Sequence, residues 1–517
     1  MAAMATEALV IYVSTFVCIF SIAALVRYIN KVWWNPLQIQ SVLRSQGVKG
    51  PSYKFLHGNV KELDSMKKKM NSSPMELSHR IFPRVLPHTY QWTRLYGKSF
   101  VLWKGCKPEI TVTEPDLIKE IMNNKDGKYP KPEPQSYVKK LFGDGIGMTN
   151  GAKWVKLRKL ANHAFNGNSL RNMIPSMITS IETMLKRWEE HEGKEIEVFQ
   201  EFKVLTSEII SRTAFGSSYL EGQKIFNMLM KMAMIIGRNP NGSKLPGIIK
   251  IFRTTDDIES DKYTQGLRKC IIELVKKREE EARRGQAGFY GDDFLGQLMK
   301  LYHEPDNAKQ ITLDELIDEC KTFYIGGQET TSCALTWTIF LLAINTDWQE
   351  KVREEVLEQF GREVPNPEGI ARLKTMNMTI HESLRLYPPA TFTLREVQKG
   401  SRLGKLIVPA NIEILIPILA LHSDPQIWGD DVHHFRPERF EGGVAKASNN
   451  NASAFLPFGL GPRSCVGMNF AISETKIALA MILQRYRFTL SPSYLHSPVA
   501  FVGMCPQHGL QIMLQKL

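Results

Sequence analysis

A run of nineteen residues without a charge, close to the N-terminus, constrains this chain more than any other feature. It reads ALVIYVSTFVCIFSIAALV, residues 8–26, and a helix needs about 20 apolar residues to cross the hydrocarbon core of a bilayer. A cleaved signal peptide is the alternative, but its apolar region is usually shorter and follows basic residues. Here Glu7 precedes the run and Arg27 follows it. We therefore expect a membrane anchor within residues 1–30, with residues 31–517 on the cytosolic side.

The rest of the chain has the pattern of one large domain. Its length alone would allow three domains, but no long linker rich in Pro, Gly and Ser divides it. Apolar residues recur mostly at helical spacing, and strand-like stretches are short. We predict a mainly α fold with small β-sheets. The expected helices cover 170–191, 313–345 and 348–361, and the expected strands cover 99–105, 413–421 and 510–515.

Composition narrows the classes of partner and cofactor. The seven cysteines are scattered and include no CxxC pair, which argues against a disulfide framework and against a cysteine-rich zinc site. The net charge of +13 permits nucleic acid, an anionic membrane or an acidic protein as partner. Because no basic run alternates with aromatic residues, we expect no nucleic-acid partner.

Near the C-terminus the chain reads FGLGPRSCVG, residues 458–467. A buried structural thiol is the ordinary interpretation of a lone cysteine. Here Cys465 comes just before a long helical pattern, and a helix N-terminus lowers the pKa of a thiol. Gly461 and Gly467 permit close approach of the backbone to a flat ligand, and Arg463 adds a cation that can bind a carboxylate. This set suits a metal held in a macrocycle that carries acid groups.

The loop resembles the haem-thiolate loop of the cytochrome P-450 superfamily, whose pattern F-x-x-G-x-R-x-C-x-G it matches completely. The resemblance implies a cytochrome P-450 fold behind one N-terminal transmembrane helix, with haem b as cofactor. It implies that Cys465 is the axial ligand to iron and that its thiolate promotes O–O cleavage. Phe458, Arg463 and Gly467 would also bind the cofactor.

A second motif, GGQETT at 326–331, interrupts an otherwise apolar helix. Two glycines within a helix cost about 1 kcal/mol each relative to alanine, and close helix packing is one explanation for them. Thr330 lies one turn after Gly326 on the same face, where its hydroxyl could stand at a gap left for a ligand. The motif resembles the oxygen-activating helix of the family, in which the acid–alcohol pair, here Glu329 and Thr330, is catalytic and delivers protons.

Two further motifs occur in the family's order. ESLR, with FRPERF about fifty residues later, implies a buried structural triad of Glu382, Arg385 and Arg439, although such ion pairs are common on helix surfaces. WVKLR places Trp154 and Arg158 on one helix face. Without the resemblance an amphipathic surface turn would be the better interpretation of that face.

In the family, the Trp154 and Arg158 positions and that of Arg395 contact the haem propionates. If Trp154 and Arg158 face the cofactor, Lys156 and Lys159 point away from it. The family's reductase docks on this side, so we expect both lysines to help bind NADPH-cytochrome P-450 reductase.

The resemblance as a whole implies a membrane-anchored monooxygenase of the endoplasmic reticulum with a cytosolic catalytic domain. It would insert one atom of O₂ into a hydrophobic small molecule (terpenoid, hormone, fatty acid or xenobiotic), with electrons from NADPH through a reductase. Two alternatives stay open: a haem-thiolate isomerase or dehydratase that needs no O₂, and a non-catalytic haem-binding protein.

The segments QGVKGPSYKFLHGN (46–59) and ECKTFYIGGQETTS (319–332) resemble the plant clan that includes brassinosteroid- and gibberellin-inactivating enzymes and secologanin synthase. These signatures indicate the clan. By family analogy, the substrate contacts would come from 132–150, Thr322, Ile325, Gly326, Thr391, Phe392 and 499–504.

Overall fold

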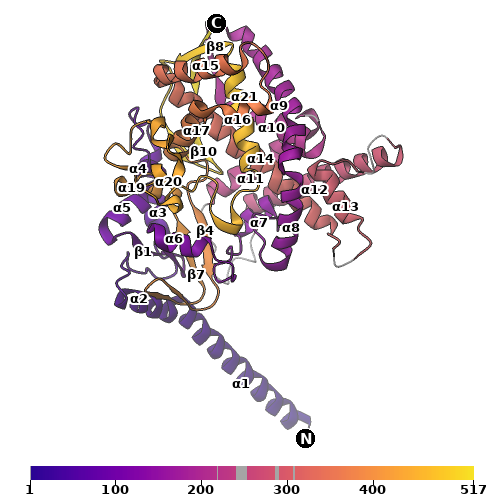
Figure 1. Cartoon of the computed structure of the whole chain (residues 1–517). Helices are drawn as coiled ribbons and strands as arrows, with labels where there is room; N and C mark the ends of the chain where they lie inside the picture. The colour runs from indigo at the N-terminus through magenta and orange to yellow at the C-terminus, as the bar shows by residue number, and fades with distance from the viewer. Residues whose placement is uncertain (1, 218, 240–252, 286–289, 307–308) are drawn as a thin grey trace.

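The computed structural model describes residues 2–217, 219–239, 253–285, 290–306 and 309–517. Helix α1 (Ala2–Ile29) projects from the body as a long arm (Figure 1). The stretch Leu9–Ser45 is the one helical stretch, in the described part of the chain, that is long and apolar enough to cross a membrane. Its most apolar window has a mean hydropathy of 2.6 and none of it is buried. This stretch overlaps the membrane anchor that the sequence predicts within residues 1–30.

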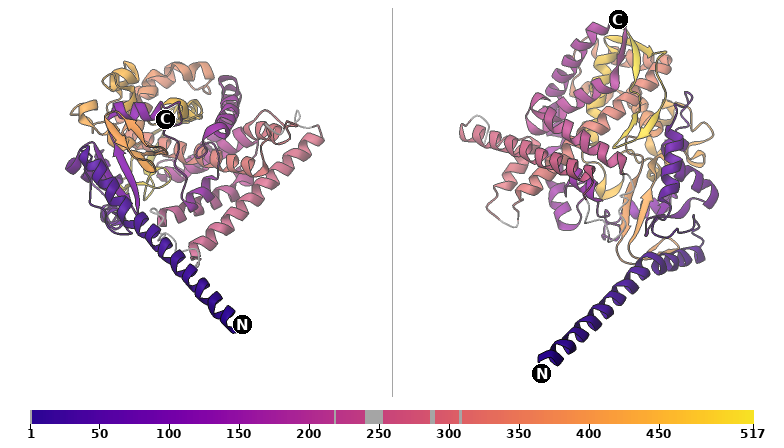
Figure 2. Two further views of the ribbon diagram at one scale, coloured as in Figure 1. Left: turned by 90° about the horizontal axis from the view of Figure 1, so that it is seen from below. Right: turned by 180° about the vertical axis from the view of Figure 1, so that it is seen from behind.

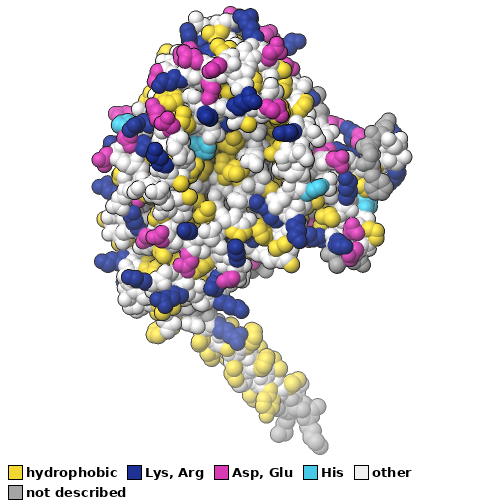
Figure 3. Space-filling model, viewed as in Figure 1, with side chains coloured by type: hydrophobic (Ala, Val, Ile, Leu, Met, Phe, Trp, Pro, Cys, Tyr) yellow, Lys and Arg dark blue, Asp and Glu magenta, His cyan; other side chains and the backbone are white. Residues whose placement is uncertain are grey.

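The arm continues into the body without a break. A π-helix (Asn30–Trp34) leads into α2 (Asn35–Ser45). At the end of α2, the Gln46 side chain bonds the Ile407 backbone in both directions, at 3.0 and 2.6 Å. Figure 2 shows α1 leaving the body at this end in both views. In Figure 3 apolar side chains predominate on the part of the arm that is not grey, whereas charged side chains are spread over the body.

The body is built mainly of helices, as predicted. The three expected helices are present as α9, α14 and α15, each within about three residues of the predicted ends. In chain order the helices after α2 are α3 (Val60–Asn71), α4 (Phe82–Val85), α5 (Pro87–Tyr96), α6 (Pro115–Met122), α7 (Ser136–Phe142), α8 (Gly151–Ala164), α9 (Gly167–Trp188), α10 (Val198–Phe215), α11 (Tyr219–Arg238), α12 (Thr255–Arg283), α13 (Phe294–Tyr302), α14 (Leu313–Ile344), α15 (Thr346–Phe360), α16 (Pro367–Arg372), α17 (Lys374–Leu386), α18 (Ile418–His422), α19 (Pro425–Trp428), α20 (Gly443–Ala447) and α21 (Met468–Leu483).

Helix α14 is the central element of this body. It is apolar around most of its circumference, which is the pattern of a helix buried on all sides. It begins at a capping box, in which Thr312 and Glu315 each accept a hydrogen bond from the other's backbone N–H. Helices α10, α17 and α21 pack around it.

The strands of the described residues form four small sheets; in Figure 1 β8 lies at the end of the body opposite α1, and β1, β4 and β7 lie at the end nearer α1. In the largest sheet the order is β1-β2-β7-β4, with β2 and β7 parallel and the other pairs antiparallel. The second sheet has the order β3-β11-β8, and β9 with β10 and β5 with β6 form pairs. The strands are β1 (Ser99–Lys104), β2 (Lys107–Val112), β3 (Glu195–Glu197), β4 (Thr393–Val397), β5 (Ser401–Leu403), β6 (Leu406–Val408), β7 (Ile412–Ile416), β8 (Tyr486–Leu490), β9 (Pro498–Ala500), β10 (Met504–Pro506) and β11 (Gln511–Lys516).

The prediction of a strand over 413–421 is correct only for its first residues. Strand β7 ends at Ile416, and the remaining residues form the short helix α18. Pro417 lies between the two elements and has no N–H to donate to a strand ladder, so the chain turns there. The expected strands at 99–105 and 510–515 are present as β1 and β11.

His496 is a buried histidine of the C-terminal segment, with 3% of its surface exposed. Its ring stacks on Phe340 at 5.1 Å, Nδ1 lies 2.9 Å from the Tyr494 hydroxyl, and Nε2 lies 3.1 Å from the Ser78 carbonyl. Burial lowers the pKa of His496 to about 4, with a smaller lowering from the charge of Arg84. The ring is therefore neutral in the folded protein at neutral pH.

This histidine makes stability depend on pH. The pKa of an unfolded histidine is about 6.5, so between pH 6.5 and 4 the unfolded chain binds the proton first and the folded state loses stability as pH falls. The loss from His496 amounts to about 2 kcal/mol at pH 5. We expect His496→Gln to lose less thermal stability than the wild type when pH falls from 7 to 5, as measured by circular dichroism. Equal losses in both proteins would contradict this pKa.

Candidate active site

A cavity of about 420 Å³ lies in the centre of the body. Phe458 and Cys465 of the cysteine loop line it, and Gly326 and Thr330 of α14 line it as well. Most of the remaining wall is apolar. The two motifs that are more than a hundred residues apart in the sequence therefore meet at one space.

The cysteine loop is a tight turn that ends just before α21. The Cys465 backbone N–H donates to the Phe458 carbonyl at 2.8 Å, and Gly467 is the N-cap of α21. Gly467 lines the cavity, as expected for close approach of a flat ligand. Gly461 has another role: its φ is +71°, and a Cβ there would lie 2.5 Å from the Met122 carbonyl oxygen. It allows the loop to pack against α6.

The start of the following helix does not by itself give Cys465 the expected low thiol pKa. The Cys465 side chain has accessible surface, and Cys465 lines the cavity. Burial raises the pKa of Cys465, while the Gly467 backbone N–H and the charge of Arg158 lower it only in part. Helix α21 begins three residues after the sulfur, at Met468, so its dipole does not outweigh burial. A coordinating metal ion deprotonates a thiol outright.

The two glycines of α14 have different functions. A Cβ on Gly326 would meet no atom within 4 Å, so this glycine opens the helix toward the cavity. A Cβ on Gly327 would lie 2.7 Å from Ile210 of α10, so this glycine permits close helix packing. The Thr330 hydroxyl stands at the opening and donates to the Gly326 carbonyl at 2.6 Å.

Glu329 and Thr330 do not face the same space. Glu329 is 2% exposed and lies outside the cavity wall. One of its carboxylate oxygens is 3.7 Å from Lys203 Nζ of α10, and neither oxygen has a hydrogen-bond partner among the described residues. Burial raises the pKa of Glu329, and the charge of Lys203 lowers it in part. Consecutive residues of a helix point about 100° apart, which explains the separation.

Trp154 and Arg158 of α8 lie at the cysteine loop. The Arg463 guanidinium lies over the Trp154 ring at 4.7 Å, and Arg463 also donates to the Asn150 side chain at 2.7 Å. Arg158 donates to the Ser464 carbonyl, one residue before the cysteine. The predicted pair thus holds the loop directly.

A group of cations that have no counterions among the described residues lies at the edge of the cavity. Lys131 bonds the Thr393 hydroxyl at 3.1 Å and faces Arg395 and Arg463. Burial and the charges of these two arginines lower the pKa of Lys131 to about 7, and burial and Arg463 lower that of Arg395 to about 10. Among the residues that the structure describes, no carboxylate forms an ion pair with Lys131, Arg158, Arg395 or Arg463. Concentrated positive charge of this kind fits an anionic ligand such as a pair of propionates.

The sequence patterns did not predict that Lys131 belongs to this cation group. It lies between Pro130 and Pro132, and no motif marks it. Only the fold brings it beside β4.

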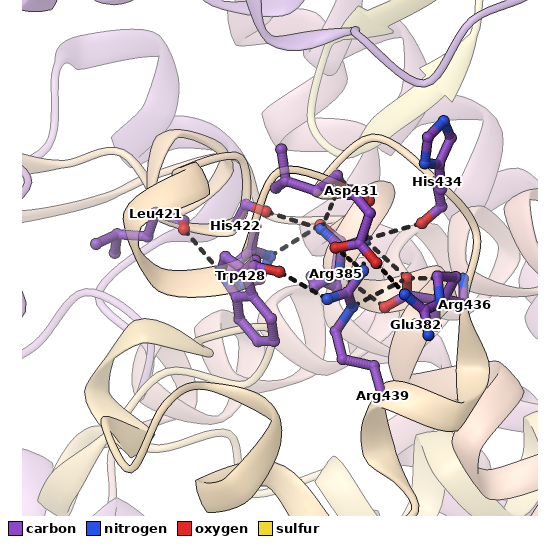
Figure 4. Close-up of polar contacts among 10 residues, drawn as sticks. Glu382, Arg385, Leu421, His422, Trp428, Asp431, His434, Arg436 and Arg439 are labelled. Carbon is purple, nitrogen blue, oxygen red and sulfur yellow. Dashed lines mark hydrogen bonds and ion pairs between the residues drawn. The ribbon is translucent and has the colours of Figure 1, made fainter.

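The structure brings together the predicted triad of Glu382, Arg385 and Arg439 (Figure 4). Glu382 and Arg385 form a bidentate ion pair with both bonds at 2.7 Å, and both side chains are fully buried. Arg439 is farther from Glu382, at 3.6 Å, and is closer to Asp431, at 3.0 Å. Asp431 therefore belongs to the cluster, together with the Arg436 N–H that donates to Glu382 at 3.0 Å.

Part of the expected substrate wall lines the cavity and part does not. Thr322, Gly326 and Phe392 line it, whereas Ile325 and Thr391 are buried outside its lining. Within 132–150, Ile146 contributes to the wall, and no residue of 499–504 is in the lining.

The cavity has a cysteine on one wall, a glycine gap and a hydroxyl on another, and at its edge cations that no carboxylate of the described residues pairs. These features fit a flat metal macrocycle with two acid groups. The family model "Cytochrome P450" matches residues 84–503. The chain belongs to the cytochrome P-450 family. It is accordingly a haem-thiolate monooxygenase in the general sense of that family.

Curated relatives agree over almost the whole chain. Cytochrome P-450 CYP749A22 of Panax ginseng is 56% identical, over 97% of this chain and 96% of its own length. Cytochrome P-450 72A397 of Kalopanax septemlobus is 40% identical and cytochrome P-450 734A1 of Arabidopsis thaliana is 38% identical, each over 95% of both chains.

The cation group predicts a role for Lys131 in haem retention. We expect Lys131→Glu to lower the ratio of haem to purified protein several-fold, because a carboxylate would repel the propionates, and Lys131→Arg to retain haem. Lys139→Glu is the matched control, since Lys139 is an exposed lysine of the neighbouring helix α7. A wild-type haem ratio in Lys131→Glu, measured by absorbance, would exclude Lys131 from the cofactor site.

Proposed function

We propose that this cytochrome P-450 is a monooxygenase of the endoplasmic reticulum membrane, with its catalytic domain on the cytosolic side. It takes electrons from NADPH through NADPH-cytochrome P-450 reductase and inserts one atom of O₂ into a hydrophobic small molecule. The observation that supports this best is the central cavity, where Cys465 and the opening at Gly326 and Thr330 share one largely apolar space.

The Cys465 thiolate would hold haem, which would supply O₂ binding and activation. Arg158 and Trp154 hold the cysteine loop from the α8 side, and the cations Lys131, Arg395 and Arg463 would hold the propionates. The remaining wall, including Phe392 and Ile146, would bind substrate through apolar contact.

Reconstitution with reductase tests this function. We expect NADPH consumption that rises when a lipid extract containing substrate is added, with products one oxygen heavier by mass spectrometry. Product formation without NADPH and O₂ would instead indicate an isomerase or dehydratase. Haem binding with no product from any extract would support the non-catalytic alternative.

The proton path that we propose runs from α10 to the cavity. The Lys203 side chain is 16% exposed and is the ionic neighbour of Glu329. Glu329 is buried and its pKa is raised, so it can hold a proton out of water. Rotation of the Glu329 side chain would carry that proton toward the Thr330 hydroxyl, which stands at the cavity.

Thr330→Ala should uncouple electron flow from product formation. The variant keeps the Cys465 site intact but loses the hydroxyl that holds a proton at the cavity. We expect NADPH consumption close to wild type, several-fold less product per NADPH and more hydrogen peroxide. Thr336→Ala is the matched control, because the Thr336 hydroxyl likewise donates to the carbonyl four residues earlier, that of Ser332 at 2.7 Å, and Thr336 is outside the cavity wall. Unchanged coupling in Thr330→Ala would reject the path.

The two lysines of α8 are not equivalent for reductase docking. Lys156 bonds the Gln310 carbonyl at 2.5 Å. Lys159 is exposed, and among the described residues no carboxylate pairs with it. Lys159 is therefore the better candidate for contact with an acidic partner.

We expect Lys159→Glu to slow reductase-supported turnover, most at low ionic strength, because charges at an interface rim act mainly on the association rate. Lys156→Glu should have the smaller effect. Peroxide-driven turnover, which bypasses the reductase, should be unchanged, and Lys186→Glu on α9 serves as an exposed-lysine control. If Lys159→Glu slows both routes equally, the docking role is wrong.

A further inference from the structure

His422 lies at the end of α18, between the buried ion pair and the cysteine loop. Only 1% of its surface is exposed. Nδ1 is 3.1 Å from the Arg385 carbonyl oxygen, and Nε2 is 3.0 Å from the Leu456 backbone nitrogen. One imidazole thus joins the backbones of two segments that are about seventy residues apart in the sequence. Figure 4 shows His422 beside Arg385.

The partners determine the tautomer of the ring. A backbone N–H can only donate, so Nε2 accepts from Leu456, and Nδ1 carries the proton and donates to the Arg385 carbonyl. Burial and the charge of Arg385 lower the pKa of His422 to about 3, so the ring stays neutral and keeps Nε2 as an acceptor.

His422 is anchored on the ion-pair side by a second bond. Its own carbonyl accepts from Arg385 Nη1 at 3.1 Å. Arg385 in turn is held by both oxygens of Glu382. The position of the imidazole is therefore fixed by a fully buried ion pair rather than by a mobile side chain.

On the other side, Leu456 begins the turn that carries the cysteine. Its carbonyl accepts from the Gly459 N–H at 3.1 Å, and the Phe458 carbonyl accepts from the Cys465 N–H at 2.8 Å. Leu456 and Phe458 both line the cavity. A shift of Leu456 would therefore move the backbone that holds Cys465.

We propose that His422 is a positioning residue that transfers the fixed position of the Glu382–Arg385 pair to the cysteine loop and so sets how Cys465 binds iron. His422 itself is outside the cavity lining. This inference rests on the proposed role of Cys465 as the iron ligand.

Packing alone is the competing explanation for a buried histidine. The ring lies 5.3 Å from Phe455 and 6.4 Å from Trp428. Phenylalanine would preserve that packing without either hydrogen bond. Asparagine would keep a donor near the position of Nδ1, and glutamine can reach the position of Nε2 with an acceptor. The three substitutions therefore distinguish the contribution of packing from the contribution of each hydrogen bond.

The experiment uses full-length wild type, His422→Phe, His422→Asn and His422→Gln. The readout is the fraction of reduced, carbon monoxide-bound protein that shows the red-shifted Soret band typical of a thiolate ligand. Haem content and thermal unfolding are measured on the same samples. We expect this fraction to fall several-fold in His422→Phe and His422→Asn at unchanged haem content, and His422→Gln to retain most of it.

A wild-type fraction in His422→Phe would overturn the proposal, since packing would then suffice. Equal loss in all three variants, parallel to a loss of thermal stability, would also overturn it, since the role would be structural only. A wild-type protein without the red-shifted band would refute Cys465 as the iron ligand, and the positioning role with it.

Discussion

The buried ion pair between Glu382 and Arg385 is the interaction on which the cysteine side of this cytochrome P-450 depends. Burying two charges costs several kcal/mol unless every polar atom is paired. All five N–H donors of Arg385 have acceptors: both Glu382 oxygens and the carbonyls of His422, Val432 and His434. The pair therefore connects α17 to α18 and to the segment that leads to the cysteine loop. Removing either partner would leave a buried charge and release these connections together.

Helix α14 forms the opposite side of the cavity, and its two adjacent glycines have different functions. Gly327 lets α10 pack closely, and Gly326 leaves the gap at the cavity. The same close packing brings Lys203 of α10 near Glu329. Helix geometry thus places the acid of the motif in a buried ionic environment and its alcohol at the cavity. On the proposed path, a proton moves across the helix from Glu329 to the Thr330 hydroxyl.

Much of this arrangement could be predicted from the sequence because it rests on local patterns. Helical periodicity located α9, α14 and α15, and the spacing around Cys465 identified the loop. Periodicity could not say where Glu329 points, because that depends on which helices surround α14. Pro417 was the local signal that should have ended the strand prediction at β7.

Lys131, Asp431 and His422 could not be predicted because their partners are distant in the sequence. Lys131 acts through Arg395 and Arg463, and His422 joins Arg385 to Leu456. The thiol pKa of Cys465 could not be predicted for a related reason. A sequence shows that a cysteine is close to a helix start, but it does not show the burial that raises the pKa of this thiol.

The most direct test of this account is the spectrum of the reduced, carbon monoxide-bound protein with and without its cysteine. We predict the red-shifted Soret band of a thiolate-ligated haem in the wild type and its loss in Cys465→Ser, with the other six cysteines intact. A Cys465→Ser variant that retains the band would contradict the account, because the iron ligand would then lie elsewhere in the chain.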